Sequence, residues 1–252
     1  MASFLGLPVN VYHAGLIFVR VGAMIMLLPA ISETVVPPRV RLALALMLCL
    51  CLGPIAGPTL PAMPAGLGDM GGQVFKELFI GLMLGGLMRL LQSALDVAGE
   101  IMAIQTTLAF SQTANPAEAQ PGATLASFLG LVGVALIFAT NLDHLFIGAM
   151  ARSYTLFPPT KPVQISDAAL MALKTVTESL ALGVQLSAPV IVFSVVFNVA
   201  TGLIGRLMPQ FQIFFAASPL SVILGLSVFM LSVGLIGVVW LQHYQLFLQQ
   251  FS

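Results

Sequence analysis

The side chains best able to do chemistry are sparse in this sequence, and they show no catalytic or metal-binding spacing. The histidines are far apart along the chain, at His13, His144 and His243. Nucleophile, phosphate-loop and zinc motifs place their residues at short fixed spacings, because one helix or loop must present them together. We find no such arrangement. The sequence therefore predicts neither an enzyme nor a bound metal or cofactor.

One arginine stands in the middle of a long apolar run. Arg20 interrupts VYHAGLIFVRVGAMIMLLPA, a candidate membrane helix at about 11–30. An arginine at the centre of such a helix costs roughly 2.5–3.5 kcal/mol in lipid, so this side chain should face protein or water. The sequence suggests Glu33, Asp96 or Glu100 as its partner. Two roles stay open: a buried ion pair that fixes helix packing, or a charge that lines a conduit.

A polar stripe lies on one face of another predicted helix. Spacings of three, four and four residues separate its members, Arg89, Gln92, Asp96 and Glu100. Those spacings follow the helical repeat and place all four on one side. The stripe needs a polar partner, an aqueous cavity or a second subunit, unless the helix end simply leaves the membrane. We expect Arg89, Asp96 and Glu100, like Arg20, to be buried charges or to line a conduit.

The overall composition sets the environment of these side chains. Of 252 residues, 59% are hydrophobic and only 7% are charged, whereas soluble domains carry roughly 25% charged residues. Too little polar surface remains to cover a molecule in water. Nine basic and nine acidic residues cancel, which gives no indication of nucleic-acid binding. The sequence predicts an all-α integral membrane protein.

About six apolar segments have the roughly 20 residues that a membrane helix needs. Their approximate bounds are 11–30, 40–57, 73–105, 123–140, 180–205 and 212–242. Prolines in and between them predict that several are kinked. The more polar residues 151–178 are expected to form an exposed loop and then a short amphipathic helix that begins near Ser166. Lys and Arg divide evenly between the two sides of a six-span protein, so no orientation is predicted.

The segment QTTLAFSQTANPAEAQPG at 105–122 separates the third apolar segment from the fourth. Its small and polar residues fit an ordinary exposed loop. However, it contains Leu108 and Phe110, apolar residues that a solvated loop does not require. A segment that folds back at membrane depth must be surrounded by protein or water. The loop is therefore a candidate re-entrant or plugging element.

The stretch RLMPQFQIFFAASPL at 206–220 interrupts the C-terminal apolar sequence. Arg206 favours a membrane interface, and Pro209 interrupts a helix. Both residues predict a turn between two apolar helices. Gln210 and Gln212 flank Phe211 beside this turn.

Several stretches together resemble the FliR family, the flagellar member of the type III secretion export gate that is called SctT in injectisomes. The combination of VPPRVR with a late MPQ before a Phe-rich run is its most specific part. The resemblance covers nearly the whole chain in order, through residues 19–46, residues 76–103, the loop TLAFSQTANPAEAQPG and residues 202–226.

The resemblance implies a structural pore subunit that assembles with several copies of FliP and with FliQ. Unfolded flagellar subunits would leave the cytoplasm through this gate in the bacterial inner membrane, within the flagellar basal body. FlhB and FlhA would be neighbours. Residues 1–178 would form a FliP-like region, and residues 179–252 a FliQ-like helical hairpin. Much of the apolar sequence would then lie within the assembly instead of forming conventional spans.

The resemblance also implies roles for individual segments. A loop at the position of residues 106–121 helps to plug the closed pore, so Leu108, Phe110, Asn115 and Pro116 become candidate plug residues. Many relatives have Asp where this chain has Asn115. The asparagine is also a turn-forming residue before proline, but it carries no charge. The FliQ connection faces the cytoplasm, which would place the hairpin turn there. Gln210 and Gln212 beside Phe211 would then face a partner at the cytoplasmic mouth of the gate. An injectisome subunit and a small-solute transporter are the alternative functions.

Overall fold

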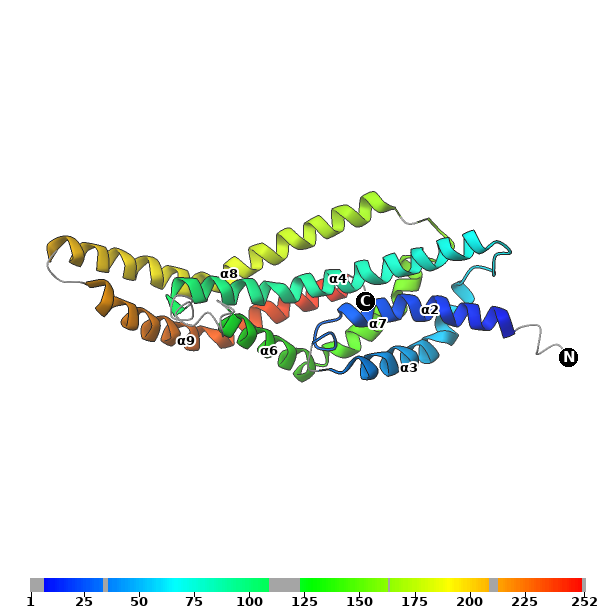
Figure 1. The fold of residues 1–252 in the computed structure, drawn as a ribbon, viewed down its shortest axis with the longest axis horizontal. Coiled ribbons are helices and arrows are strands. Elements are labelled where there is room, and N and C mark those ends of the chain that lie inside the picture. Colours follow the sequence, from blue (N-terminus) through cyan, green and yellow to red (C-terminus); the bar gives the residue numbers. More distant parts are fainter. Residues whose placement is uncertain (1–6, 34–35, 109–122, 163, 209–212, 251–252) are drawn as a thin grey trace. The chain divides into compact units, whose positions relative to one another are not determined.

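The structure, a computed structural model, describes residues 7–33, 36–108, 123–162, 164–208 and 213–250. Within those ranges the regular elements are helices, and none is a strand (Figure 1). Their bounds are α2 Leu7–Leu27, α3 Pro38–Ala56, the short 3₁₀ helix η1 Gly57–Thr59, α4 Leu67–Gln105, α6 Ala123–Ala139, α7 Leu142–Leu156, α8 Ile165–Leu207 and α9 Ile213–Gln249.

The number of long apolar helices confirms the predicted fold class. In the part of the chain that the structure describes, five helices are long and apolar enough to cross a membrane. A sixth candidate is the pair Leu125–Ala139 and Leu142–Leu156, which bends by 77° at the break between its helices. The chain is an all-α membrane protein whose described residues form five such helices, or six if the sharply bent pair counts as one span.

Helices α4 and α8 extend beyond the predicted apolar segments. The prediction of a separate amphipathic helix after residue 165 was wrong, because residues 165–207 form one continuous helix. At 1.5 Å per residue, α4 is about 58 Å long and α8 about 64 Å. Both exceed the roughly 30 Å hydrocarbon layer. Part of each helix must therefore lie outside that layer or within a protein assembly.

Helix α7 was not predicted. Residues 151–156 were assigned to a polar loop, but they form the last part of α7. Asn141 breaks the chain between α6 and α7 in a left-handed conformation with φ 56° and ψ 32°, which asparagine adopts more readily than most residues. The buried residues of α7 follow a helical spacing, namely Leu142, Phe146, Ala149, Met150, Ser153 and Tyr154. That spacing was the available signal for an amphipathic helix.

The chain divides into two compact units. The first contains Met1–Leu90, Ile137–Val176 and Gln245–Ser252, and the second contains Leu91–Leu136 and Thr177–Tyr244. Helices α4 and α8 each contribute to both units. The division into a FliP-like region at 1–178 and a FliQ-like hairpin at 179–252 describes resemblance, not compactness, and stays a prediction.

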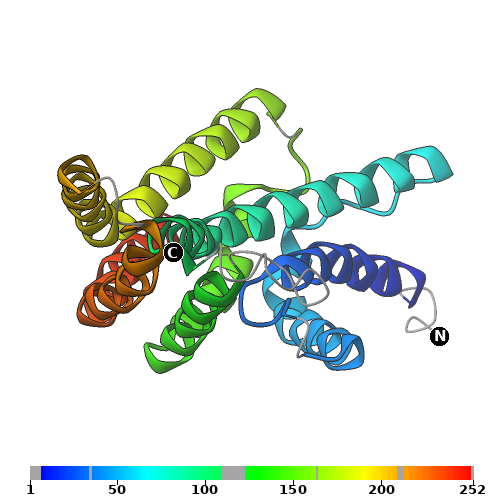
Figure 2. The same ribbon diagram turned by 60° about the vertical axis from the view of Figure 1, so that its left-hand side comes forward.

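In the first unit, two glycines bring α4 against α2. A Cβ on Gly81 would lie 2.5 Å from the backbone oxygen of Arg20, and one on Gly85 would lie 3.0 Å from the backbone oxygen of Met24. The GxxxG pattern at 81–85 therefore does what such patterns do in membranes, since it lets two helix backbones approach closely. Helix α3 also packs on α2, and Figures 1 and 2 show these two helices side by side.

In the second unit, glycines again set the helix packing. A Cβ on Gly99 of α4 would lie 2.4 Å from the Cα of Ala126 in α6. One on Gly183 of α8 would lie 3.0 Å from the backbone oxygen of Ala94 in α4. These contacts leave no room for side chains between the helices, so the backbones pack closely here.

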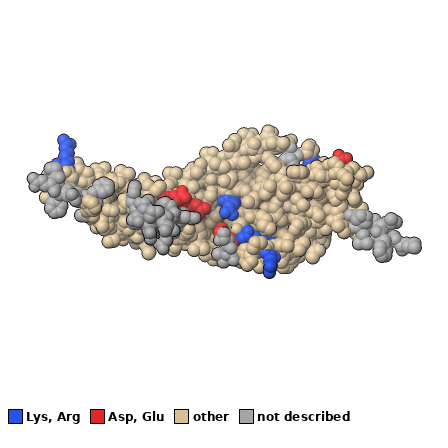
Figure 3. Space-filling view, in the orientation of Figure 1, with Lys and Arg blue, Asp and Glu red and all other residues tan. Residues whose placement is uncertain are grey.

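Large apolar side chains are exposed on the outside of both units. On α8 and α9 they include Val192, Val195, Val196, Val199, Met230, Leu231 and Leu235, each more than half exposed. Figure 3 shows charged side chains at only a few places on the face drawn. Exposed apolar surface of this extent indicates contact with lipid or with another protein.

Candidate functional site

Arg20 lies in a buried ion pair at the centre of the first unit. It is completely shielded from solvent, and Glu77 is 1% exposed. The guanidinium binds the Glu77 carboxylate at two points: Nε donates to Oε2 at 2.5 Å, and Nη2 donates to Oε1 at 3.0 Å. This two-point geometry is the strongest that arginine makes with a carboxylate.

The remaining donors of Arg20 bind the end of α7 and the residue that follows it. Nη1 donates to the carbonyl of Ser153 at 2.9 Å and approaches its Oγ at 3.4 Å, while Nη2 donates to the carbonyl of Phe157 at 3.0 Å. The guanidinium carbon also lies 4.3 Å from the centre of the Tyr154 ring. An arginine has five N–H donors, and these contacts supply an acceptor for each. The cluster therefore joins α2, α4 and α7.

Lys76 extends the cluster along the connection between α7 and α8. Its Nζ donates to the carbonyl of Pro159 at 2.5 Å and to the carbonyl of Lys161. Arg20 and Lys76 together bind four carbonyl oxygens between residues 153 and 161. Two cations from α2 and α4 thus fix the path of this connection.

The prediction of Glu33, Asp96 or Glu100 as the partner of Arg20 was wrong, because Glu77 has that role. Glu77 stands one helical turn before Gly81, on the same face of α4 as the GxxxG pattern. The signal was therefore present: an acidic residue shared a face with the glycines that bring α4 against α2.

The structure distributes the polar stripe among different neighbours. In the first unit, Arg89 is exposed and donates from Nη1 to the Ser32 hydroxyl at 2.6 Å. In the second unit, Gln92 is 7% exposed and donates to the carbonyl of Gly130 in α6 at 3.3 Å. Asp96 and Glu100 are exposed on the same unit. Gln92 is therefore the member of the stripe that is buried between helices.

The start of the candidate plug loop is anchored in the second unit. Ser194 of α8 donates to the Gln105 side chain at 2.8 Å, and Asn198 donates to the Ser194 hydroxyl at 3.2 Å. Thr106 is fully buried, and a Cβ on Gly225 of α9 would lie 2.4 Å from its methyl group. The chain therefore leaves α4 from a position held by α8 and α9.

Of the residues predicted for the plug loop and the hairpin turn, the structure describes only Leu108 and Arg206. Leu108 is half-buried. Arg206 is exposed in the last turn of α8. The other predicted residues of the loop and the turn lie outside the described residues, namely Phe110, Asn115, Pro116, Pro209, Gln210 and Gln212.

No catalytic or metal site emerges from the described part of the chain. Within it, no group of three or more histidine, cysteine, aspartate or glutamate side chains could hold a metal ion. The charged cluster around Arg20 has its donors bound to Glu77 and to backbone carbonyls. Its arrangement suits a structural ion pair better than the lining of a conduit.

Comparison with known proteins assigns the chain to a family. The family model for bacterial export proteins, family 1, matches residues 11–247. Flagellar biosynthetic protein FliR of Caulobacter vibrioides is 51% identical over 243 residues, which make up 96% of this chain and 97% of that relative. The FliR protein of Escherichia coli is 30% identical over 82% of this chain and 79% of the relative. That of Aquifex aeolicus is 27% identical over 93% of this chain and 90% of the relative. The chain therefore belongs to the FliR family of bacterial export proteins, whose members are components of the flagellar export apparatus.

Proposed function

We propose that this chain is a structural pore subunit of the flagellar type III export gate. It assembles with FliP and FliQ homologues in the bacterial inner membrane and passes unfolded flagellar subunits out of the cytoplasm. The observation that carries the proposal is the 51% identity to the FliR protein of Caulobacter vibrioides over 97% of that relative. A match of this length leaves little of the chain for a different activity.

The exposed apolar surface supports assembly with other membrane proteins. Helices α8 and α9 leave many valine, leucine and methionine side chains uncovered in the isolated chain. Both helices also exceed the length that a bilayer can cover. Neighbouring helices of FliP-like and FliQ-like subunits would cover the surface that lipid does not. In this proposal, residues 179–252 act as the FliQ-like hairpin.

The loop at about 106–121 acts as the plug of the closed gate in this proposal. The anchoring of Gln105 by Ser194 supports it, because a plug needs a fixed point from which to enter the pore. Of the four candidate plug residues, Leu108 lies within the described residues. Phe110, Asn115 and Pro116 lie outside them.

The turn between α8 and α9 faces the cytoplasmic mouth of the gate in this proposal. Arg206 is exposed there, and Pro209, Gln210 and Gln212 would complete a surface for a partner. FlhB and FlhA are the expected membrane neighbours. A basic side chain at the end of a long apolar helix is suited to an interface between membrane and water.

The charged residues divide into two groups in this proposal. Arg20 fixes the internal packing of the subunit, as its complete burial and saturated hydrogen bonding support. Arg89, Asp96 and Glu100 are exposed in the isolated chain. In the assembly they face polar side chains of neighbouring subunits or water in the conduit.

Deleting the gene tests the proposed function. We expect loss of flagellar filaments and of swimming, because subunits can no longer leave the cell. The membrane potential should stay normal, since the proposal gives this chain no part in energy transduction. Restoring the gene on a plasmid should restore filaments. Normal swimming after deletion would contradict the proposal.

A further inference from the structure

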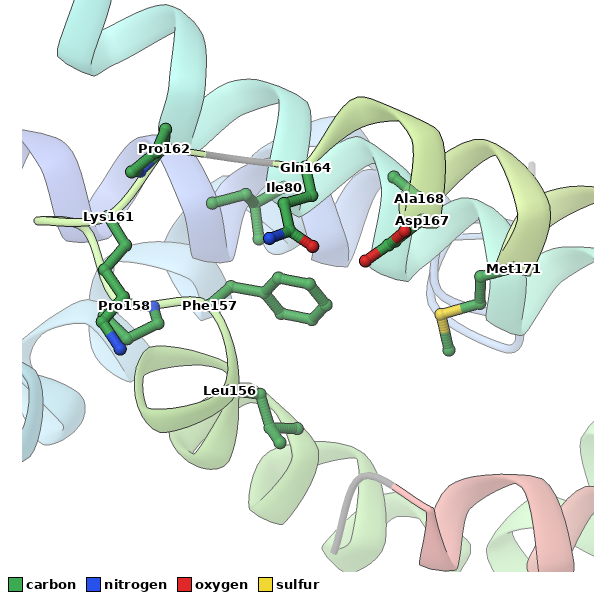
Figure 4. A pocket seen from close by; sticks show the side chains of 10 residues that line it. All are labelled: Ile80, Leu156, Phe157, Pro158, Lys161, Pro162, Gln164, Asp167, Ala168 and Met171. Carbon is green, nitrogen blue, oxygen red and sulfur yellow. The ribbon is translucent and has the colours of Figure 1, made fainter.

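The first unit contains a cavity of about 360 Å³ beside the Arg20 cluster. It lies between α4, the end of α7, the connection after α7 and the first turns of α8 (Figure 4). Cavities of roughly 300–1,000 Å³ are typical of sites for small molecules. The lining residues are Ile80, Leu156, Phe157, Pro158, Lys161, Pro162, Gln164, Asp167, Ala168 and Met171.

One wall of this cavity is held in place by hydrogen bonds from Arg20 and Lys76 to its backbone carbonyls. Arg20 binds the carbonyl of Phe157, and Lys76 binds the carbonyls of Pro159 and Lys161. The wall thus rests on the ion-paired core of the unit. A wall that is already fixed before binding reduces the entropic cost of ordering it when a ligand binds.

The lining has an apolar part and two charged groups of opposite sign. Figure 4 shows the Phe157 ring pointing into the cavity, with Asp167 and Gln164 on the α8 side. In this view Lys161, which also lines the cavity, lies on the opposite side of the Phe157 ring from Asp167. The lining therefore offers an acceptor for a cationic amine, a cation for an anionic group, and apolar surface for hydrocarbon.

We propose that this cavity binds a zwitterionic phospholipid of the phosphatidylethanolamine type. Asp167 and Gln164 accept hydrogen bonds from its ammonium group, and Lys161 binds its phosphate. The glycerol end and the first carbons of the acyl chains lie along Phe157 and Met171. The rest of the lipid extends out of the open side of the cavity.

The charges of the cavity select this class over other lipids. A lipid with an anionic headgroup and no amine would place no cation near Asp167. A quaternary ammonium has no N–H to donate, so it forgoes charge-assisted hydrogen bonds with the carboxylate. A small water-soluble zwitterion would leave the apolar surface around Phe157 unfilled. Phosphatidylethanolamine alone among these satisfies both parts of the lining.

The position of the cavity in the sequence agrees with a lipid headgroup. Its walls include residues from the connection at 157–162 and Gln164, with prolines and a lysine between two helices that have exposed apolar faces. A lysine at the end of an apolar helix can bury its aliphatic stem and extend its amine to the depth of the headgroups. An acyl chain leaving the cavity would then meet surrounding lipid.

Lipid exchange followed by native mass spectrometry tests this proposal. The tagged full-length chain, purified with its FliP and FliQ homologues, is stripped in detergent and mixed with vesicles of equal phosphatidylethanolamine and phosphatidylglycerol. We expect about a tenfold excess of retained phosphatidylethanolamine, the effect of one charge-assisted hydrogen bond. Asp167→Asn should remove most of this preference. Equal retention of both lipids by the unaltered complex would overturn the proposal.

A cavity-filling pair of variants separates binding in the cavity from general lipid association. Met171→Trp should abolish selective retention, because the larger ring occupies the cavity. Leu170→Trp is the matched control, since Leu170 is 66% exposed and does not line the cavity. It should retain the lipid. Equal retention by both variants, or a cross-link from the cavity to a neighbouring subunit in place of lipid, would contradict the proposal. Neither result would affect the proposed export function.

Discussion

Arg20 and Glu77 form a two-point ion pair that depends on the glycine one turn after Glu77. The side chain of Glu77 can reach Arg20 only because α4 lies directly against α2 at Gly81, where a Cβ would be 2.5 Å from the Arg20 carbonyl. The close approach of the backbones and the ion pair are therefore one feature. It also brings α2 and α4 to the end of α7 through Ser153 and Phe157.

Breaking this ion pair should impair assembly. In Arg20→Leu the Glu77 carboxylate loses its partner while still buried, which costs about 3–5 kcal/mol in folded proteins. We expect a large loss of folded chain and of complex recovered from membranes. The amount of tagged protein that co-purifies with its partners measures this loss.

A double variant provides the control for that experiment. Replacing both partners with apolar residues, as in Arg20→Met with Glu77→Leu, removes both buried charges and should recover much of the lost protein. If Arg20→Leu instead assembled fully but exported nothing, the side chain would have a role in the conduit and the structural account would be wrong.

Adding one methyl group at Gly81 should separate α2 from α4. In Gly81→Ala the new carbon would meet the backbone of Arg20, which cannot move aside as a side chain can. Overpacking of this kind costs about 1–3 kcal/mol. We expect a lower melting temperature for the purified complex. Gly86→Ala is the matched control on the same helix, because a Cβ there has nothing within 4 Å. Equal melting temperatures for the two variants would argue against the close contact.

The sequence predicted the fold class well, because apolar length alone identifies helices in a membrane protein. It predicted that the third apolar segment ends at residue 105, which is where α4 ends. It failed at residues 151–156, which were assigned to an exposed loop but form the end of α7. It also separated a short amphipathic helix near Ser166 from the apolar segment at about 180–205, although both belong to one continuous helix. Lys174 and Glu178 are exposed on that helix, so the charged side chains mark an outer face of α8 and not a break in it.

The site was predictable only in part. The cost of a charge in lipid indicated that Arg20 must be enclosed, and it is. Its partner was not predicted, because Glu77 and Arg20 are 57 residues apart and meet only through helix packing. Every residue has a backbone carbonyl, so the residue types do not indicate which carbonyls bind Arg20 and Lys76. Interactions with the main chain are therefore the part of the site that sequence reasoning could not reach.

Shortening the candidate plug loop should make the gate leak. In a chain whose residues 109–121 are replaced by a short Gly/Ser linker, the anchor at Gln105 remains but the plug is lost. We expect higher ion conductance of the assembled complex in planar bilayers. The unaltered complex, prepared in the same way, is the control. Unchanged conductance in a fully assembled complex would count against a plug at this position.

Reversing the charge at the hairpin turn should impair export without preventing folding. In Arg206→Glu the exposed end of α8 would repel an acidic partner surface and would no longer suit a negatively charged membrane face. We expect reduced swimming in soft agar with normal protein levels. Arg152→Glu reverses a charge at an exposed position of α7 and serves as the comparison. Normal swimming by Arg206→Glu would show that the turn has no charge-dependent partner.

Affinity purification tests the central claim most directly. The tagged chain is expressed together with its FliP and FliQ homologues and purified in mild detergent. Mass spectrometry then identifies the proteins that co-purify with it. A structural pore subunit predicts one stable complex that contains all three proteins. Recovery of the chain alone as a folded monomer, with both homologues present in the same membranes, would contradict the account.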